Sequence, residues 1–277
     1  MLIDTHCHLD AREFAEDRPT VIARAERAGV DAIVIPAIAR ANFDVVRQLA
    51  QEFSGGYYVL GIHPIAVPEA QDEDLQFLEQ QIEASLPDAR FVGIGEIGLD
   101  FFLPALKEPP MREKQERYFD AQLRLAQRFE LPVIVHVRRS QDDVLKHLRR
   151  REGVAGIAHA FNGSFQQAQQ FIDRGFVLGF GGAMTFERSL QIRRLASQLP
   201  LESLVLETDA PDIPPAWLGQ AGGERQRNEP CHVARIGQEL AQLRGLAYQD
   251  VVAATGRNAR RVLPRLAGAP CGADTVD

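Results

Sequence analysis

The sequence predicts a single domain of the α/β class, a (β/α)8 TIM barrel in which eight parallel strands alternate with helices. Two observations support this prediction: short apolar runs recur along the chain, and stretches with helical spacing of apolar residues lie between them. Eight such units in about 250 residues suit a closed barrel better than an open sheet. The alternative, an open doubly wound sheet, is disfavoured because no G-x-G-x-x-G motif follows the first strand.

Strands are expected where an apolar run ends in a polar cluster or a glycine, at 2–5, 32–36, 57–61, 91–94, 133–135, 156–158, 177–180 and 204–206. Apolar spacing predicts a helix over 112–130, a second from Phe165 to just before Gly175, and a third with an apolar face over 233–243. The irregular stretch 211–230 is expected to form a loop over the top of the barrel. No linker divides the chain, so we expect one catalytic domain over 1–264 and a C-terminal tail over 265–277.

The chain has 277 residues, of which 45% are hydrophobic and 25% charged, an ordinary globular composition. Its net charge of −7 argues against a broad, sequence-independent grip on nucleic acid. Three cysteines without CxxC spacing indicate neither a disulfide framework nor a thiolate zinc site, and they favour a reducing compartment. No signal peptide precedes the first motif, and no run approaches the roughly 20 apolar residues of a membrane span. We therefore expect a cytoplasmic protein with no membrane association and no obligate protein partner.

Candidate metal ligands stand at the ends of several predicted strands. His6 and His8 follow the first strand, where residues two apart point to the same side. Later strand ends carry Glu96, His136, His159 and Asp209. In a barrel these ends converge on one mouth, where the active sites of this fold are built. Clustered imidazoles and carboxylates need cations to offset their desolvation and repulsion, so a metal site is predicted.

Six ligands suffice for two ions that share a bridging carboxylate and keep a position for water. Glu96 is the expected bridge because its strand lies between the two groups of ligands. The histidines of strand one and Asp209 of the neighbouring strand eight are expected at one ion, and His136 and His159 at the other. Asp209 is also placed to take the proton from the attacking water, so Asp209 and Glu96 are the expected catalytic residues. None of the three lysines lies at a strand end, which excludes a carboxylated-lysine bridge.

A set of motifs runs through the chain in a fixed order. They are DTHCH (4–8), GIHP (61–64), GEIGLD (95–100), HVR (136–138), HAFNG (159–163), ETDAP (207–211) and NEP (228–230). This set resembles that of the TatD-type metal-dependent deoxyribonucleases, and most closely a YjjV-like branch of that family. The resemblance implies a TIM barrel with a two-metal site and hydrolase activity, typically that of an exonuclease on DNA and sometimes RNA. It also implies that the six residues named above are the metal ligands, with Glu96 touching both ions.

The ligand set and the resemblance together predict a divalent-metal-dependent phosphodiesterase, a 3′–5′ exodeoxyribonuclease that acts on single-stranded DNA ends through a metal-activated water. Imidazole-rich ligation favours Zn or Mn, whereas the family is often assayed with Mg, so the identity of the two divalent cations stays open. The alternative is a metal-dependent hydrolase of small ester, amide or phosphodiester substrates without nuclease activity. This alternative stays open because a site with two metal ions can also activate a water molecule to attack a carbonyl carbon.

Three residues are expected to contact the substrate. His63 ends the third strand and faces the same mouth, which suits a phosphate contact, although a role in supporting a ligand or the structure is the alternative. Arg138 follows His136 on the same side, and its guanidinium matches phosphate geometry, although a salt bridge under a loop is the alternative. Asn162 approaches the substrate or forms a turn. The segment 216–227 departs from the family pattern and overhangs the site, so substrate choice stays open.

Four further residues are expected to have supporting or structural roles. Asp4 and Glu207 precede ligands by two positions and are expected to support them from behind. Cys7 lies between two ligands and is expected to pack in the barrel wall. His147 belongs to a basic run and is expected on a solvated helix face.

Overall fold

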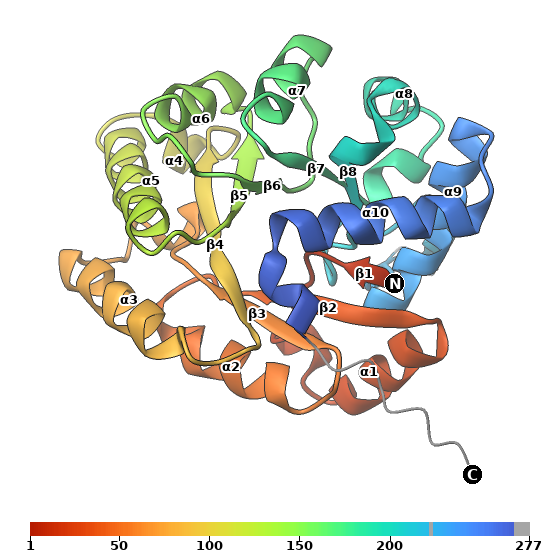
Figure 1. Ribbon diagram of the computed structural model, residues 1–277, viewed down its shortest axis with the longest axis horizontal. Helices are drawn as coiled ribbons and strands as arrows, with labels where there is room; N and C mark the ends of the chain where they lie inside the picture. The colour runs from red at the N-terminus through yellow and green to blue at the C-terminus, as the bar shows by residue number, and fades with distance from the viewer. Residues whose placement is uncertain (222–223, 269–277) are drawn as a thin grey trace.

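Eight parallel strands form a barrel surrounded by helices, which confirms the predicted fold class (Figure 1). The structure is a computed structural model that describes residues 1–221 and 224–268. Each strand pairs in parallel with its neighbour in sequence, in the order β1 to β8. The strands are β1 (Leu2–Asp4), β2 (Val30–Pro36), β3 (Gly56–Leu60), β4 (Phe91–Asp100), β5 (Val133–Arg138), β6 (Gly156–Ala158), β7 (Val177–Phe180) and β8 (Leu204–Leu206).

The barrel is joined between β1 and β8 by backbone contacts that lie just beyond the ends of these short strands. The amide of Asp209 donates to the carbonyl of His6 over 2.8 Å, and the amide of His8 donates to the carbonyl of Ala210 over 2.8 Å. Cys7 bridges to Ala210 in parallel register and is fully buried, as expected for a residue of the barrel wall. The residues that join β1 to β8 therefore include three of the predicted ligands themselves, His6, His8 and Asp209.

Helices cover the outside of the barrel between successive strands (Figure 1). They are α1 (Arg18–Arg27), α2 (Phe43–Gln51), α3 (Asp72–Ser85), α4 (Pro104–Lys107), α5 (Met111–Arg128), α6 (Gln141–Leu148), α7 (Phe165–Ile172), α8 (Leu190–Gln198), α9 (Val233–Arg244) and α10 (Tyr248–Val262). The limits of α7 follow from its sequence. Ser164 accepts a hydrogen bond from the amide of Gln167 at the N-terminus, and Gly175 adopts a φ of 82° just after the helix.

Two separate apolar cores result from the alternation of side chains along each strand. One core lies between the strands and the outer helices, and its largest members include Phe14, Phe91, Phe119 and Phe171. The other fills the inside of the barrel and takes residues from every strand: Ile3, Ala32, Val34, Tyr57, Val59, Val92, Ile134, Ile157, Val177 and Val205. The barrel is thus packed rather than hollow, and its polar residues gather at one end.

The last helix closes the inner core at the end where the strands begin. Ala259 and Val262 of α10, with Leu263 and Leu266 beyond it, belong to the same apolar cluster as the inward-facing strand residues. Figure 1 shows α10 running across the barrel. Leu266 lies in a 3-10 helix over Pro264–Gly268, where Arg265 donates to the carbonyl of Leu86 over 2.7 Å. The segment expected as a tail therefore begins in contact with the barrel, and residues 269–277 lie outside the described residues.

The fourth strand is longer than predicted and contains the GEIGLD motif rather than ending before it. The ladder with β5 continues through Ile97 and Leu99 to Asp100, after a register shift between Ile94 and Ile97. Glycine makes this close pairing possible, since a Cβ at Gly98 would lie 2.1 Å from the His136 carbonyl oxygen. The other strands lie within three residues of their expected limits.

Two other expectations need correction. The stretch 211–230 is not wholly irregular, because it contains a 3-10 helix over Ala216–Leu218 and a short antiparallel pair, β9 (Gln220–Ala221) and β10 (Glu224–Arg225). The Gly222–Gly223 pair lies outside the described residues. His147 is not on a solvated face but is 5% exposed, packed edge-on against Phe119 of α5. The basic residues around it are exposed, which is why the local composition suggested a surface position.

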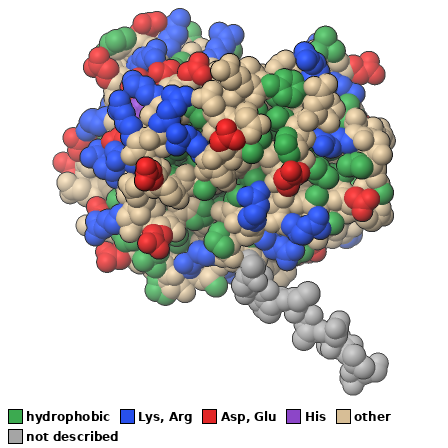
Figure 2. All heavy atoms as spheres, turned by 45° about the horizontal axis from the view of Figure 1, so that its top comes forward, with side chains coloured by type: hydrophobic (Ala, Val, Ile, Leu, Met, Phe, Trp, Pro, Cys, Tyr) green, Lys and Arg blue, Asp and Glu red, His purple; other side chains and the backbone are tan. Residues whose placement is uncertain are grey.

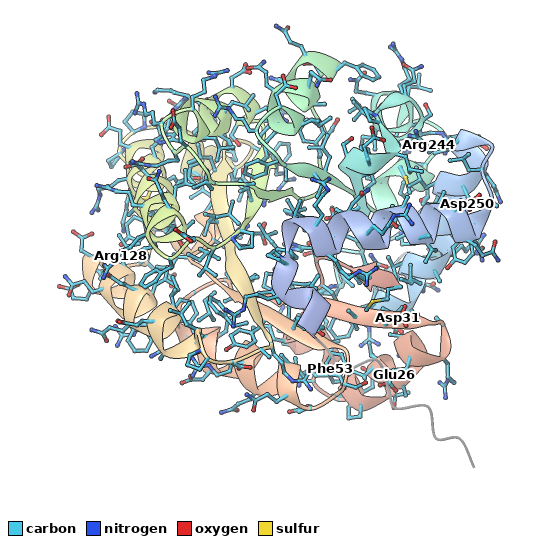
Figure 3. The ribbon with its side chains drawn as sticks, in the orientation of Figure 1. Glu26, Asp31, Phe53, Arg128, Arg244 and Asp250 are labelled. Carbon is cyan, nitrogen blue, oxygen red and sulfur yellow. The ribbon has the colours of Figure 1, made fainter. Side chains whose placement is uncertain are left out.

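The outer surface mixes both charges, and ion pairs link neighbouring helices. Arg128 of α5 pairs with Glu79 of α3, and Arg244 of α9 donates to two carbonyls at the end of α8 (Figure 3). Figure 2 shows Lys and Arg side chains gathered on the side of the molecule where α5 and α6 lie. Within the described part of the chain, no helix combines the length and the apolar character needed to cross a membrane.

Candidate metal centre

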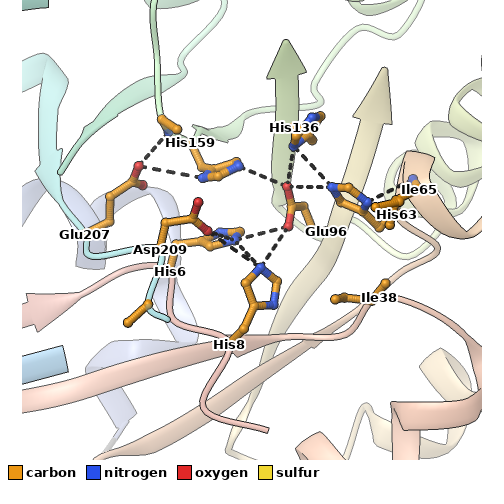
Figure 4. A network of polar contacts seen from close by, with 12 residues as sticks. His6, His8, Ile38, His63, Ile65, Glu96, His136, His159, Glu207 and Asp209 are labelled. Carbon is orange, nitrogen blue, oxygen red and sulfur yellow. Dashed lines mark hydrogen bonds and ion pairs between the residues drawn. The ribbon is translucent and has the colours of Figure 1, made fainter. Parts of the chain in front are cut away.

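The polar residues that follow the strands converge at the carboxyl end of the barrel, around Glu96 (Figure 4). Glu96 lies at the register shift in β4, where the irregular pairing directs its side chain into the mouth. The structure brings all six predicted ligands together, and His63 lies with them: His6, His8, His63, Glu96, His136, His159 and Asp209.

One carboxylate oxygen of Glu96, Oε2, faces the residues that join β1 to β8. It lies 3.1 Å from His6 Nε2 and 3.5 Å from His8 Nε2. Asp209 Oδ1 is 3.5 Å and 3.6 Å from the same two nitrogens, which are 3.2 Å apart. We refer to His6, His8 and Asp209 as the β1/β8 group.

The other oxygen, Oε1, faces histidines from the middle of the barrel. It lies 2.8 Å from His136 Nδ1 and 2.9 Å from His159 Nε2, and we refer to these two histidines as the β5/β6 group. His63 Nε2 approaches the same oxygen at 3.3 Å. The ring of His159 also stacks on that of His6 at 3.9 Å between centroids, so the two groups are in direct contact. The two oxygens of one carboxylate are thus shared between two sets of imidazoles.

The hydrogen-bond network assigns different tautomers to His136 and His63. His136 Nε2 lies 3.1 Å from Asp100 Oδ2 and donates its proton there, so the neutral ring would offer the lone pair of Nδ1 to a cation beside Glu96. Without a cation, burial acts against protonation of His136, but the hydrogen bonds to Asp100 and Glu96 outweigh it and raise the pKa of His136. His63 is reversed: its Nδ1 accepts from the Ile65 amide over 3.0 Å, so Nε2 carries the proton. His63 therefore directs an N–H donor into the site, whereas the neutral ring of His136 directs a lone pair.

Two carboxylates support the β5/β6 group from outside. Asp100 holds His136, and its other oxygen accepts the amides of Phe102 and Leu103 over 2.8 and 3.1 Å. Glu207 faces His159 Nδ1 at 3.6 Å and accepts the Ala160 amide over 2.5 Å. Glycine at 179 makes room for Glu207, because a Cβ there would lie 2.1 Å from its Oε2.

Two buried glutamines on α5 hold the backbone of the strand ends. Gln122 accepts from the Ile62 amide over 2.7 Å and donates to the Ile62 carbonyl over 3.1 Å, which fixes the residue before His63. Gln115 accepts from the Asp100 amide over 2.9 Å. Neither glutamine nor the role of Asp100 was predicted from the sequence. The available signal is the seven-residue spacing, which puts both glutamines on the apolar face of the helix with Phe119.

The β1/β8 group depends on Asp4 and on the backbone. Asp4 does not touch an imidazole: its Oδ1 accepts the amides of His6 and Thr208 over 3.3 and 2.9 Å, and its Oδ2 accepts the Thr208 hydroxyl over 2.6 Å. Its support is thus exerted through the main chain. Asp209 has a φ of 58°, a left-handed conformation that costs a non-glycine residue about 1 kcal/mol. Its backbone contact with His6 holds it there.

Burial and mutual contacts shift the pKa of most groups in the site. Burial keeps the pKa of His6 well below its ordinary value and lowers that of His63 to about 4. Burial acts against protonation of His8 too, but the Glu96 carboxylate outweighs it and raises the pKa of His8 to about 9. Burial raises the pKa of Asp209 to about 6. Burial would also raise the pKa of Glu96, but the surrounding imidazoles hold it well below its ordinary value.

The donor set fits divalent cations. Five imidazoles direct a ring nitrogen at one carboxylate, and the facing nitrogens of His6 and His8 are only 3.2 Å apart. Neutral lone pairs at this distance repel each other unless a cation or a proton lies between them. Nitrogen and carboxylate ligands with outer hydrogen bonds, such as that of Asp100 to His136, are typical of protein metal sites.

The other two predicted substrate residues lie at the rim. Arg138 ends β5 with an exposed side chain whose Nη1 is 3.8 Å from Asp100 Oδ2. Asn162 is exposed on the loop after β6, and its carbonyl accepts a hydrogen bond from Gln141 over 2.7 Å. Arg138 thus lies at the end of a strand and Asn162 on a loop, and the roles of both stay predictions.

The chain is similar to known proteins over almost its whole length. The uncharacterized metal-dependent hydrolase YjjV of Escherichia coli is 39% identical over 257 residues, covering 92% of this chain and 95% of YjjV. Its crystal structure superposes with a TM-score of 0.86 at 37% identity, covering 95% of this chain and 98% of that one. Human deoxyribonuclease TATDN3 is 31% identical, covering 96% and 95% of the two chains. The 3′–5′ ssDNA/RNA exonuclease TatD of Citrobacter koseri is 33% identical, covering 94% and 97%.

The family model described as TatD related DNase matches residues 3–264, which include every residue of the centre around Glu96. With its eight-stranded barrel and its carboxylate shared between two groups of imidazoles, the chain belongs to the TatD family of metal-dependent hydrolases.

Proposed function

We propose that this protein is a metal-dependent phosphodiesterase that removes nucleotides from the 3′ end of single-stranded DNA, with two divalent cations at the centre. The main support is the position of Glu96 between two groups of candidate ligands. One of its carboxylate oxygens faces each group, at distances of 2.8 to 3.5 Å. The names of the TATDN3 and TatD relatives support nucleic acid as the substrate.

The β1/β8 group with Glu96 Oε2 would hold one cation, and the β5/β6 group with Glu96 Oε1 the other. Bound cations would supply Lewis-acid polarisation of a phosphoryl oxygen and a water acidified for attack. Zinc or manganese suits the imidazole-rich ligands better than magnesium. Glu96 itself would keep the two cations at a fixed separation, since both of its oxygens are engaged.

Asp209 would accept the proton of the attacking water. Its carboxylate lies beside His6 and His8, and burial raises its pKa, which makes it a stronger base than an exposed carboxylate. As water attacks phosphorus, the bond from phosphorus to the 3′ oxygen of the preceding nucleotide would break. That oxygen would leave with the shortened strand and take up the proton from Asp209, while the phosphate would stay on the released nucleotide.

Two cationic or donor groups would orient the phosphate. His63 would donate from Nε2, because its Nδ1 accepts from the Ile65 amide and the ring therefore carries its proton on Nε2. Arg138 would bind a substrate phosphate from the rim through its guanidinium, and the side chain of Asn162 would contact the strand from the loop after the neighbouring β6. A cytoplasmic setting is part of this proposal, because the two cysteines of the described chain, Cys7 and Cys231, are free.

The test is hydrolysis of single-stranded and duplex oligonucleotides labelled at the 5′ end, with Mg, Mn or Zn in separate reactions. A stepwise ladder from the 3′ end is expected, and Asp209→Asn should slow it by at least about 100-fold because the base is lost. Asp212→Asn is the matched control, since it removes an exposed carboxylate three residues away. A ladder of equal strength in Asp209→Asn would point to a contaminating nuclease.

Hydrolysis of carboxylic esters and amides distinguishes the proposed phosphodiesterase from the alternative hydrolase. Arg138→Ala should lower kcat/KM for oligonucleotides strongly and leave small carboxylic esters almost unaffected, because only a phosphate uses the guanidinium. A metal-loaded protein that leaves every oligonucleotide intact but hydrolyses small esters or amides would overturn the nuclease assignment.

A further inference from the structure

An aromatic ring with two arginines lies at the rim of the centre, and the mechanism above uses only one of the three residues, Arg138. Phe102 follows β4 and is 41% exposed, a high value for a phenylalanine. The guanidinium carbons of Arg138 and Arg139, at the end of β5, lie 3.9 and 4.8 Å from the centroid of its ring. We refer to these three residues as the Phe102 cluster.

The charge of this cluster is incompletely balanced. Within the described residues, Arg139 makes no ion pair or side-chain hydrogen bond, and Arg138 has only Asp100, at 3.8 Å. The neighbouring Arg112 differs, because it stacks on Phe101 but pairs with Glu116 and Asp143. Stacking uses the face of a guanidinium and leaves its N–H donors free along the edge, where they can bind an oxyanion.

The backbone under the cluster is fixed in place. The Phe102 amide donates to Asp100 Oδ1 over 2.8 Å, and Asp100 in turn holds His136. Arg139 has a φ of 55° at a sharp turn, and the next residue, Ser140, donates from its hydroxyl to the Leu99 carbonyl over 2.6 Å. Both sides of the cluster are therefore anchored to β4, the strand that carries Glu96.

Resting on the proposed phosphodiesterase function, we propose that the Phe102 cluster is a second phosphate subsite, which binds the phosphate adjacent to the scissile one. The chain from Arg138 through Asp100 to His136 links the two sites by side-chain contacts. The substrate class that follows is a strand with at least two consecutive phosphates, rather than a small diester. Phe102 acts as a positioning residue that holds the two guanidiniums.

The test combines a substrate change with a protein change. A single-stranded oligonucleotide is compared with the same strand carrying one neutral methylphosphonate linkage next to the scissile bond. The neutral linkage should raise KM about tenfold for the wild type, the value of one charge-assisted hydrogen bond, and should have little effect on Arg139→Gln. Arg139→Gln should also lower the slope of log KM against log salt by about one.

Two further variants separate positioning from general damage. Phe102→Leu should raise the oligonucleotide KM about as much as Arg139→Gln, whereas Phe102→Tyr should restore it by restoring the ring. Arg150→Gln, which removes an exposed arginine beyond the other end of α6, is the matched control and should change KM less than twofold. Equal sensitivity of wild type and Arg139→Gln to the neutral linkage would overturn the subsite. An abasic nucleotide that reproduces the effect of the neutral linkage would also overturn it, in favour of base stacking.

Failure of the proposed function would be recognised separately. If the wild type cleaves neither the oligonucleotide nor bis(4-nitrophenyl) phosphate, the phosphodiesterase assignment falls. Binding of a fluorescent single-stranded oligonucleotide to the Asp209→Asn protein then decides the subsite. About tenfold weaker binding after adding Arg139→Gln supports it, and unchanged binding overturns it.

Discussion

The two groups of ligating side chains on either side of Glu96 are held in different ways. In the β1/β8 group, His6 and Asp209 are fixed by the same backbone hydrogen bonds that join the barrel, with Asp4 bonded to main-chain amides. In the β5/β6 group, support comes from side chains, since Asp100 holds His136 and Glu207 faces His159. One half of the centre is therefore coupled to folding, while the other half depends on individual hydrogen bonds.

The carboxylate common to both halves should give the largest effect. Glu96→Gln keeps the shape but removes the charge that both groups face, so bound metal should be lost from both and activity should fall by at least about 1000-fold. Metal content per chain and oligonucleotide cleavage are the measurements, with circular dichroism to show that the fold is kept. Full metal content with a modest loss of rate would contradict a bridging role.

A change at Asp100 should affect only the β5/β6 group. In Asp100→Asn the amide would donate to His136 Nε2, which moves the imidazole proton to Nδ1 and blocks the lone pair directed at Glu96. The affinity for one of two metal equivalents should fall by about 10- to 100-fold, as is usual for outer hydrogen bonds. Calorimetric titration distinguishes the two equivalents, and Asp142→Asn, an exposed carboxylate on α6, is the control. Equal weakening of both equivalents would mean that the two halves are not independent.

The sequence predicts that the candidate ligands meet because each lies within a strand or within four residues of its end, and a barrel brings all carboxyl ends together. The sequence predicts the position of Glu96 less accurately, because β4 was expected to end at Ile94 and Glu96 was expected to follow it. Apolar character stops there, but the ladder with β5 continues over glycines whose missing side chains allow close pairing. Strand limits in glycine-rich motifs depend on the partner strand, which a single sequence does not specify.

Supporting residues were harder to predict because their partners are distant along the chain. Gln122 bonds to Ile62 across 60 residues, and Asp100 meets His136 across 36. The burial of His147 was missed for a similar reason: its own helix is basic, and the Phe119 ring against which it packs belongs to α5. Local composition indicates exposure only where no distant helix covers the residue.

Proton coupling should distinguish His8 from His6 within the β1/β8 group. Contacts with Glu96 raise the pKa of His8 to about 9, against the effect of burial, whereas burial holds that of His6 well below its ordinary value. Metal must displace the His8 proton, so apparent affinity should rise by up to about tenfold per pH unit between about pH 6.5 and 9, with one proton released. In metal-free protein the raised pKa stabilises the fold fully below about pH 6.5, and this contribution is lost as pH rises through about 9.

Calorimetry of metal binding in buffers of different ionisation enthalpy measures the protons released. His8→Gln should abolish the release attributed to this residue, and an unchanged proton count in that variant would assign the release elsewhere.

The smallest effect is expected where the β1/β8 group meets the fold itself. Thr208→Val removes the hydroxyl that donates to Asp4 Oδ2 over 2.6 Å, so a buried carboxyl loses a partner and the link between β1 and β8 weakens. Unfolding of the metal-free protein in urea should become easier by about 1–3 kcal/mol. Thr255→Val is the matched control, because its buried hydroxyl bonds only to two carbonyls of its own helix and its loss should cost less. If both variants lose equal stability, the Asp4–Thr208 contact does not link the metal centre to the contacts that join β1 to β8. The β1/β8 group would then be no more closely coupled to folding than the β5/β6 group.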